Sequence, residues 1–432
     1  MSDRLVARLG GRFYYGWVVL AVASFGGFIS AGSSQMYIGS VLLAITQETG
    51  WTHTAISSAL LAGTVTGGLI SPLAGAWVDR RGPRLLMGVA ALVMAAGFVL
   101  MGWSPDLAVF YLGYMLARGA AQGALGGAAQ RAIAVHWFLH YRGRALGIAS
   151  MSVPLGGAAM AFAGAWAQRH GWDWRELFTA MAVLSVVAVV PPAWTLLRRS
   201  PEAIGLLPDG GPVADGQVKP GRRPRPTGDE YQWTLAQALR TRALRLLMGA
   251  AVVAIAANGT VVFYHVIYLV SRGVSQVQAV TAVSILALTG ALANVVWGYL
   301  SEFFSERLLA IVSQLLAAGG ILLLLTVDTG TGALLLSAVL GLLVRGEGSL
   351  TGLILSNYFG RFAFGRIAGL MASVQLVALG LGPVIASAVY DVFQSYAAIY
   401  GLIAAGYIGS ASFYLLARRP VPPPGEPSSQ PS

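Results

Sequence analysis

Apolar runs of about 20 residues recur along the whole chain, separated by short breaks that are rich in charge, glycine or proline. A helix of that length is just long enough to cross a hydrocarbon core of about 30 Å, so the pattern predicts a series of transmembrane helices. Twelve spans are expected, at 16–38, 53–77, 85–103, 108–133, 145–166, 176–197, 246–270, 277–300, 308–327, 332–356, 367–389 and 395–416.

The expected spans fall into two groups of six, which predicts an all-α membrane protein built from two six-helix bundles, residues 1–198 and 246–417. Residues 199–245 are rich in proline, glycine and charge, the composition of a solvated linker. Residues 418–432 hold mainly Pro, Ser and Gln, and a disordered cytoplasmic tail is expected there.

Composition agrees with a membrane location. Hydrophobic residues make up 56% of the chain and charged residues 10%, against about a quarter charged in a soluble domain. The chain contains no cysteine, which excludes disulfides, thiolate metal sites and thiol catalysis. We therefore expect neither a metal nor a cofactor, and the lipid bilayer is the expected surrounding of the spans.

The formal charge of +11 could indicate a nucleic-acid partner, but the basic residues gather in alternate loops. Cytoplasmic loops of membrane proteins keep the excess of Lys and Arg, so both termini and the linker are expected on the cytoplasmic side of the inner membrane, with no nucleic acid bound. The loops expected there hold Arg4, Arg8, Arg12, Arg80, Arg81, Arg84, Arg142 and Arg144, whereas Arg169, Arg175 and Arg272 fall on the other side.

Three short motifs of the first half recur in the second half at offsets between about 222 and 227 residues. This order makes the halves parallel repeats, an arrangement that places a binding site near the membrane midplane. The pairs are 75–79 with 298–302, Arg118 with Arg345, and 143–147 with 365–369.

The loop 75–84 resembles the signature that the major facilitator superfamily carries between its second and third helices. Arg118, with Gln122 and Gly123, resembles the fourth-helix signature of the same superfamily. The resemblance covers the chain apart from its tail. It implies two pseudo-symmetric six-helix bundles and solute transport by alternating access.

Within that superfamily, 15–17, 50–57 and the linker run 199–210 are similar to bacterial members of the monocarboxylate and oxalate:formate transporter group. That similarity implies an organic anion as substrate. Two positions depart from the group. Asn294 stands where the eighth helix often has a cation, and Gly39 and Ser40, near Tyr37, stand where some members have a lysine in the first helix.

Ionisable residues inside a span are functional candidates because an unpaired charge in hydrocarbon costs several kcal/mol. Arg118 lies near the middle of the fourth span, where it either binds or couples a solute or packs against carbonyls of a neighbouring helix. Arg345 and Glu347 are two residues apart, so they point to different sides of the tenth span. Glu347, the one carboxylate placed in mid-span, is the candidate for proton coupling, and a buried ion pair with another helix is the alternative.

Several uncharged polar side chains are further candidates for a cavity. Asn258, His265 and Tyr268 have the spacing of one helix face. Each of these residues has an alternative role as a hydrogen bond between helices. The complete set of polar candidates is Tyr37, Gln122, Asn258, Tyr264, His265, Tyr268, Asn294 and Gln375, with Gln35 and Gln130 considered on the same grounds.

Asp79 ends the second span on the cytoplasmic side, where the eleventh span begins, and a carboxylate is stabilised beside a helix N-terminus. The resemblance assigns a gating role to Asp79 with Arg80 and Arg84, and Glu302 is the expected pseudo-symmetric partner. Loop charges that serve only topology are the alternative.

These features predict a secondary active transporter, functional as a monomer, for a small organic solute of the carboxylate type, coupled to protons or working by exchange. Efflux of an apolar or amphipathic compound is the alternative, and a transporter-like nutrient sensor is a further one. A membrane enzyme is disfavoured because the linker holds no cluster of catalytic residues.

Overall fold

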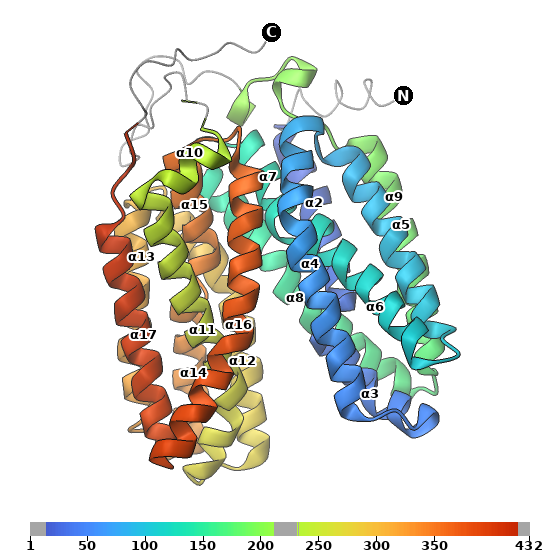
Figure 1. Cartoon of the computed structure of the whole chain (residues 1–432), viewed down its shortest axis with the longest axis vertical. Coiled ribbons are helices and arrows are strands. Elements are labelled where there is room, and N and C mark those ends of the chain that lie inside the picture. The colour runs from blue at the N-terminus through green and yellow to red at the C-terminus, as the bar shows by residue number, and fades with distance from the viewer. Residues whose placement is uncertain (1–13, 211–230, 232, 422–432) are drawn as a thin grey trace. The chain divides into compact units, whose positions relative to one another are not determined.

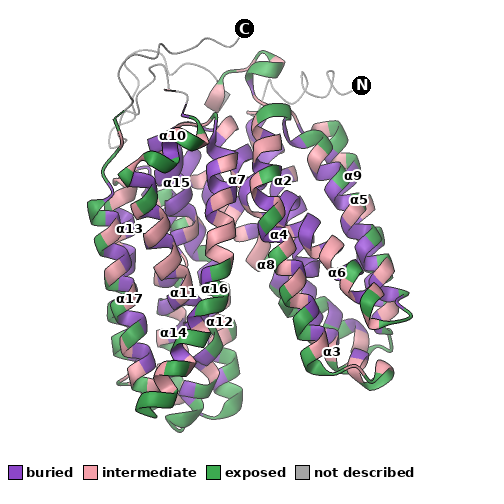
Figure 2. Ribbon diagram, in the orientation of Figure 1, coloured by how far each residue is buried: buried purple, intermediate pink, exposed green. Residues whose placement is uncertain are grey.

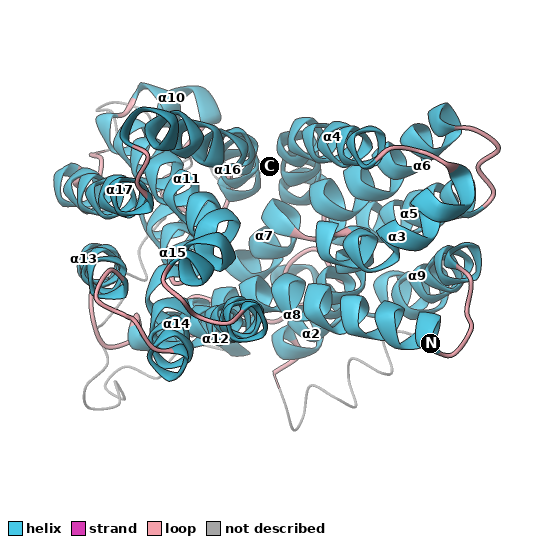
Figure 3. Ribbon diagram, turned by 90° about the horizontal axis from the view of Figure 1, so that it is seen from below, coloured by secondary structure: helices cyan, strands magenta, loops and turns pink. Residues whose placement is uncertain are grey.

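A computed structural model describes residues 14–210, 231 and 233–421 of the chain. In this part of the chain the regular elements are helices, without strands (Figure 3). The contacts divide the chain into two compact units. Unit 1 contains residues 1–218 and 361–373, and unit 2 contains residues 219–360 and 374–432.

Unit 1 is a helical bundle in which α5 packs on α9, α4 on α6, and α2 on α8. The first turns of α16, up to Ser373, also belong to this unit. Its helices are α2 (Gly16–Ser30), α3 (Gln35–Thr49), α4 (His53–Arg81), α5 (Pro83–Gly102), α6 (Leu107–Ala120), α7 (Gly127–Trp137), α8 (Arg142–Arg169) and α9 (Trp174–Leu196).

Unit 2 is a second bundle, in which α11 and α13 run beside α17, and α12 packs on α14 (Figure 1). Its helices are α10 (Leu235–Arg240), α11 (Arg242–Ser271), α12 (Gln276–Leu300), α13 (Glu306–Leu324), α14 (Gly330–Val344), α15 (Glu347–Phe359), the greater part of α16 (Phe364–Phe393), and α17 (Tyr396–Leu416).

The helices are apolar on their outer faces as well as their inner ones. Figure 2 shows buried residues where the helices of each unit face one another and exposed residues around them. Many exposed residues are large and apolar, such as Leu69, Leu73 and Val187, each at least 66% exposed. Such a surface is stable when lipid covers it. Among the described residues, eleven helical stretches are long and apolar enough to cross a membrane.

The one expected span that is missing from these eleven is the fourth, 108–133, which is interrupted and so does not form one long helix among the described residues. α6 ends at Ala120, a π-helical turn covers Ala121–Leu125, and α7 begins at Gly127. Gly126 is extended, and Gly127 has a φ of 57°, which glycine adopts without strain. The tenth expected span is interrupted too, between α14 and α15.

The first expected span also differs from the prediction. α2 ends at Ser30, the 3₁₀ turn Ala31–Ser33 follows, and α3 continues to Thr49. The side chain of Ser34 caps α3 by accepting a hydrogen bond from the backbone N–H of Tyr37. The apolar helical stretch Gly16–Thr49 is therefore 34 residues long and ends well after residue 38.

The predicted linker contains ordered structure where it is described. Short 3₁₀ turns form at Glu202–Ile204 and Pro208–Gly210, and α10 begins with a capping box between Thr234 and Gln237. Residues 211–230 and 232, and most of the predicted tail, from residue 422, lie outside the described residues.

Close packing in unit 1 depends on glycine at the crossing of α2 and α8. A Cβ added to Gly156 would lie 2.2 Å from the carbonyl oxygen of Phe28, whereas one added to Gly157 would have its nearest atom at 3.6 Å. Small residues at helix crossings let membrane helices approach closely.

We expect Gly156→Ala to destabilise unit 1 by about 1–3 kcal/mol, because the added methyl group overpacks against backbone that cannot rotate away. Thermal melting of the purified protein in detergent would measure the change. The adjacent Gly157→Ala is the matched control and should melt like the unmodified protein. Equal melting temperatures for the two variants would contradict this description of the crossing.

Candidate solute-binding site

Arg118 lies in the last turn of α6, just before the break in the fourth span. Glycines of α4 face it: a Cβ on Gly63 would lie 3.0 Å from Cβ of Arg118, and one on Gly67 would lie 3.0 Å from Cβ of Gln122. α6 can therefore approach α4 closely. The Nε atom of Arg118 and Oε1 of Gln122 are buried without a hydrogen-bond partner among the described residues.

Arg345 occupies the corresponding place in unit 2, at the break between α14 and α15. A Cβ on Gly290 of α12 would lie 2.5 Å from Cγ of Arg345, so this glycine makes room for the arginine stem. The same sequence offset relates Gly63 to Gly290 and Arg118 to Arg345. Nε of Arg345 is also buried without a hydrogen-bond partner among the described residues.

The breaks matter because an interrupted helix leaves polar backbone groups inside the membrane. π-helical turns are rare and occur frequently at functional sites. At the second break, no side chain caps the start of α15. Each unit thus combines an arginine with a buried Nε atom, an interrupted helix and a facing glycine.

Glu347 begins α15 and is 6% exposed. Its Oε1 accepts hydrogen bonds from Nε2 of Gln375, at 3.2 Å, and from Oγ1 of Thr351, at 3.4 Å. Thr351 is also 2.7 Å from the hydroxyl of Tyr414, on α17. Sequence reasoning identified Glu347 and Gln375, and unit 2 brings both into one polar network.

His265 lies inside the core of unit 2 and is fully buried. Its Nε2 is 2.8 Å from Oγ of Ser337, and its Nδ1 is 3.4 Å from the Tyr400 hydroxyl. The Tyr268 ring packs on Tyr400, with ring centroids 4.2 Å apart. His265 and Tyr268 of α11 therefore both contact Tyr400, and the histidine is engaged with neighbouring helices.

The remaining polar candidates lie in several places. The Tyr264 hydroxyl is 2.7 Å from Oγ of Ser387, and the Tyr37 hydroxyl donates to the carbonyl of Leu177. Asn294 donates to the carbonyl of Gly290, one turn earlier in α12, which places it beside the stem of Arg345. Asn258 is 7% exposed on α11.

Gln130 and Gln35 differ in their burial. Gln130 is buried, and its Nε2 donates to Oγ of Ser152 at 2.7 Å. Gln35 is exposed at the first position of α3.

Asp79 lies near the end of α4, and its side chain is 3% exposed. Its Oδ1 accepts a hydrogen bond from the backbone N–H of Gly365, at 3.0 Å, and its Oδ2 one from that of Arg366, at 3.1 Å. All three residues belong to unit 1. A Cβ on Gly75 would lie 1.9 Å from the carbonyl oxygen of Gly365, so glycine is required for this close approach. The carboxylate thus caps the start of α16.

The other gating candidates are on loops or helix ends. Arg80 and Arg84 are exposed, at the end of α4 and the start of α5. Glu302 is 7% exposed in the turn after α12.

The linker contributes two carboxylates that sequence reasoning did not identify. Glu202 pairs with Arg361, with Oε1 2.7 Å from Nη1. Asp209 accepts hydrogen bonds from three consecutive backbone N–H groups, those of Leu139, His140 and Tyr141, at 2.8, 2.5 and 3.4 Å. In sequence, the run 199–210 is distinguished by its family resemblance, and Glu202 and Asp209 are the signal in it that could have indicated these contacts.

Burial raises the pKa of Glu202, but hydrogen bonds from its own backbone and from Ser200, and the charge of Arg361, outweigh burial and leave this pKa below its usual value. A lowered pKa means that the Glu202–Arg361 pair stabilises the fold at neutral pH and loses this contribution as the pH falls through the folded-state pKa. Because both side chains are partly exposed, the contribution is small.

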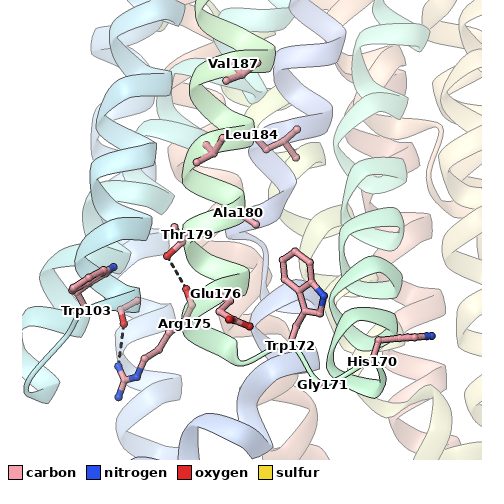
Figure 4. Close-up of a pocket in the computed structure, with 12 residues that line it drawn as sticks. Trp103, His170, Gly171, Trp172, Arg175, Glu176, Thr179, Ala180, Leu184 and Val187 are labelled. Carbon is pink, nitrogen blue, oxygen red and sulfur yellow. Dashed lines mark hydrogen bonds between the residues drawn. The ribbon is translucent and has the colours of Figure 1, made fainter.

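Unit 1 also has an open pocket of 1200 Å³ along α9 (Figure 4). Trp103, Trp172 and Arg175 surround one end of it, and Leu184 and Val187 line the other. Arg175 is already bonded to Glu48 and to the carbonyl of Gly102. The pocket contains none of the candidate residues, and its apolar, exposed lining is that of a lipid-facing surface. We place the candidate site at the broken helices.

Comparison with known proteins gives three findings. The family model described as Major Facilitator Superfamily matches residues 23–346 and 246–432. A curated protein of Thermoproteus tenax, an uncharacterized 38 kDa protein in a 23S RNA operon, is 32% identical over 124 residues. That match spans 28% of this chain and 31% of the length of the relative.

Solved structures have the same fold. The transporter FucP, in its outward conformation, is 12% identical with a TM-score of 0.69, and 93% of this chain covers 99% of that one. The proton:xylose symporter XylE is 15% identical with a TM-score of 0.70, and 93% of this chain covers 95% of that one. The family model matches most of the chain, so the protein is a multi-pass membrane transporter that belongs to the major facilitator superfamily.

Proposed function

We propose that this transporter carries a small organic anion of the carboxylate type across the inner membrane by alternating access, driven by protons. It works as a monomer, with both termini on the cytoplasmic side, where the loops are rich in arginine. The substrate class and the coupling ion are the parts of this proposal that go beyond membership of the superfamily.

One observation carries the substrate class. Each unit holds an arginine at a broken helix whose Nε is buried without a hydrogen-bond partner among the described residues. A guanidinium offers donors only, and its planar fork matches a carboxylate. A bound carboxylate would neutralise the charge and accept these bonds, whereas a neutral solute would leave the charge uncompensated.

Glu347 supports proton coupling. It is buried, and it accepts hydrogen bonds from Gln375 and Thr351. A carboxyl group within a span is a functional candidate that can bind and release a proton, so binding of a proton at Glu347 can accompany binding of an anion in the same unit. This charge balance favours symport of one proton with the anion.

Asp79 supports a cytoplasmic gate. Its two hydrogen bonds to the start of α16, at 3.0 and 3.1 Å, are partly buried, and they hold a helix N-terminus. In this proposal, breaking them loosens the start of α16 from the end of α4. In this proposal the exposed Arg80 and Arg84 keep the loop on the cytoplasmic side. Glu302 has the corresponding gating role in unit 2.

Proteoliposomes with an inward proton gradient should take up at least one member of a panel of formate, lactate, pyruvate, oxalate and benzoate. Arg118→Gln and Arg345→Gln should reduce the uptake at least tenfold, because each loses a charge-assisted hydrogen bond of about 1.5–3 kcal/mol. Efflux of lipophilic cations without carboxylate flux would instead favour export of amphipathic compounds. Absence of any flux with folded protein would favour a sensor.

Glu347→Gln should abolish acceleration of uptake by the proton gradient and retain exchange of internal for external substrate, because the amide cannot release a proton. Uptake and counterflow of the same radiolabelled carboxylate separate the two activities. Glu306→Gln, at the start of α13, is the control and should retain both. Proton-driven uptake by the Glu347 variant would disprove this coupling site.

Asp79→Ala should increase hydrogen exchange at the amides of Gly365 and Arg366 by about tenfold or more, since both lose a charged acceptor. Exchange measured by mass spectrometry on the purified protein would detect the change. Asp106→Ala removes a carboxylate cap from α6 in the same unit and should leave these two amides protected. Unchanged protection in the Asp79 variant would contradict the proposed gate contact.

A further inference from the structure

Tyr407 is a buried tyrosine of α17 that the sequence did not single out as a candidate. Its side chain is 1% exposed, and its hydroxyl is buried without a hydrogen-bond partner among the described residues. A buried hydroxyl without a partner costs about 1–3 kcal/mol, and such a group in a folded protein calls for an explanation.

Tyr407 lies close to the break in the tenth span. Tyr407 belongs to the same buried cluster as Leu340 and Val344, the last turn of α14 before Arg345. It is also close enough to interact electrostatically with both Arg345 and Glu347. The hydroxyl therefore lies near Arg345, whose Nε is buried without a hydrogen-bond partner among the described residues.

The unpaired groups at this break are complementary to one kind of ligand. The Nε of Arg345 is a donor only, and a tyrosine hydroxyl can donate. Arg345 and Gly346, the two residues between α14 and α15, keep helical φ and ψ, so the arginine follows the course of the span. The guanidinium and the hydroxyl both favour an acceptor that carries negative charge.

We propose that the Tyr407 hydroxyl binds the substrate carboxylate together with Arg345, so that the last helix of the chain supplies part of the solute site. This inference rests on the proposed carboxylate substrate and adds a residue to its site. The carboxylate accepts one hydrogen bond from the guanidinium and one from the hydroxyl.

Tyr414 provides a matched control on the same helix. It lies seven residues later, on the same face of α17, and it is fully buried. Like Tyr407, it interacts electrostatically with Glu347. Its hydroxyl, however, is paired with Thr351 at 2.7 Å. The two tyrosines therefore differ in whether the hydroxyl has a partner within the protein.

The test compares Tyr407→Phe with Tyr414→Phe in the purified full-length protein. Equilibrium binding of radiolabelled formate, lactate, pyruvate, oxalate and benzoate is measured, together with melting of the protein without ligand. Tyr407→Phe should raise the Kd for the bound carboxylate at least about tenfold, because the variant cannot donate the hydrogen bond to it. The melting temperature should not fall, because the Tyr407 hydroxyl makes no hydrogen bond to the described residues of the protein. Tyr414→Phe should lower the melting temperature and leave the Kd within about twofold.

Two results would overturn the inference, and they differ in what they imply for the transporter. If the unmodified protein binds a carboxylate and Tyr407→Phe binds it equally well, Tyr407 is not part of the site and the proposed function stands. If the unmodified protein binds no member of the panel, both the carboxylate substrate and the role of Tyr407 are disproved.

Discussion

A guanidinium inside a membrane span must meet a partner, and this requirement links the main features of the structure. Arg118 and Arg345 each lie at an interrupted helix, and each presents a buried Nε without a partner among the described residues. The cost of a charge in hydrocarbon is several kcal/mol. In the proposed function, a solute with negative charge compensates this cost at both arginines.

The same requirement explains the local backbone. Gly63 and Gly290 let a neighbouring helix approach each arginine stem closely, and the helix interruptions leave polar backbone groups beside the guanidinium. Glu347 adds a buried carboxyl group to unit 2, where it accepts hydrogen bonds from Gln375 and Thr351. In the proposed function, unit 2 accepts an anion and a proton together.

Much of the fold could be predicted from sequence, because membrane thickness fixes the length of each apolar run and the repeated motifs fix the pairing of the halves. The superfamily is confirmed by the family model, whereas the monocarboxylate-type subgroup and the roles of the site residues remain predictions. The helix breaks could not be predicted, since an apolar run reads the same whether it is continuous or interrupted.

The individual site residues also differ in how far the sequence could predict them. Arg118, Arg345 and Glu347 were recognisable because charge is rare within a span, and Asp79 because it stands in a family motif. Tyr407 resembles other core tyrosines of α17 in sequence, and only its unpaired hydroxyl distinguishes it. His265 was recognisable as a polar residue, but its bond to Ser337 depends on how α11 and α14 pack.

The central claim is that an organic anion neutralises the arginine at a broken helix, and anomalous diffraction locates such an anion directly. Crystals of the full-length protein grown with para-bromobenzoate should show a bromine peak within one ring length of the Arg345 or the Arg118 guanidinium, with the carboxylate facing it. A bromine peak found only in the apolar pocket along α9, with both guanidinium groups bonded to protein acceptors, would contradict the account.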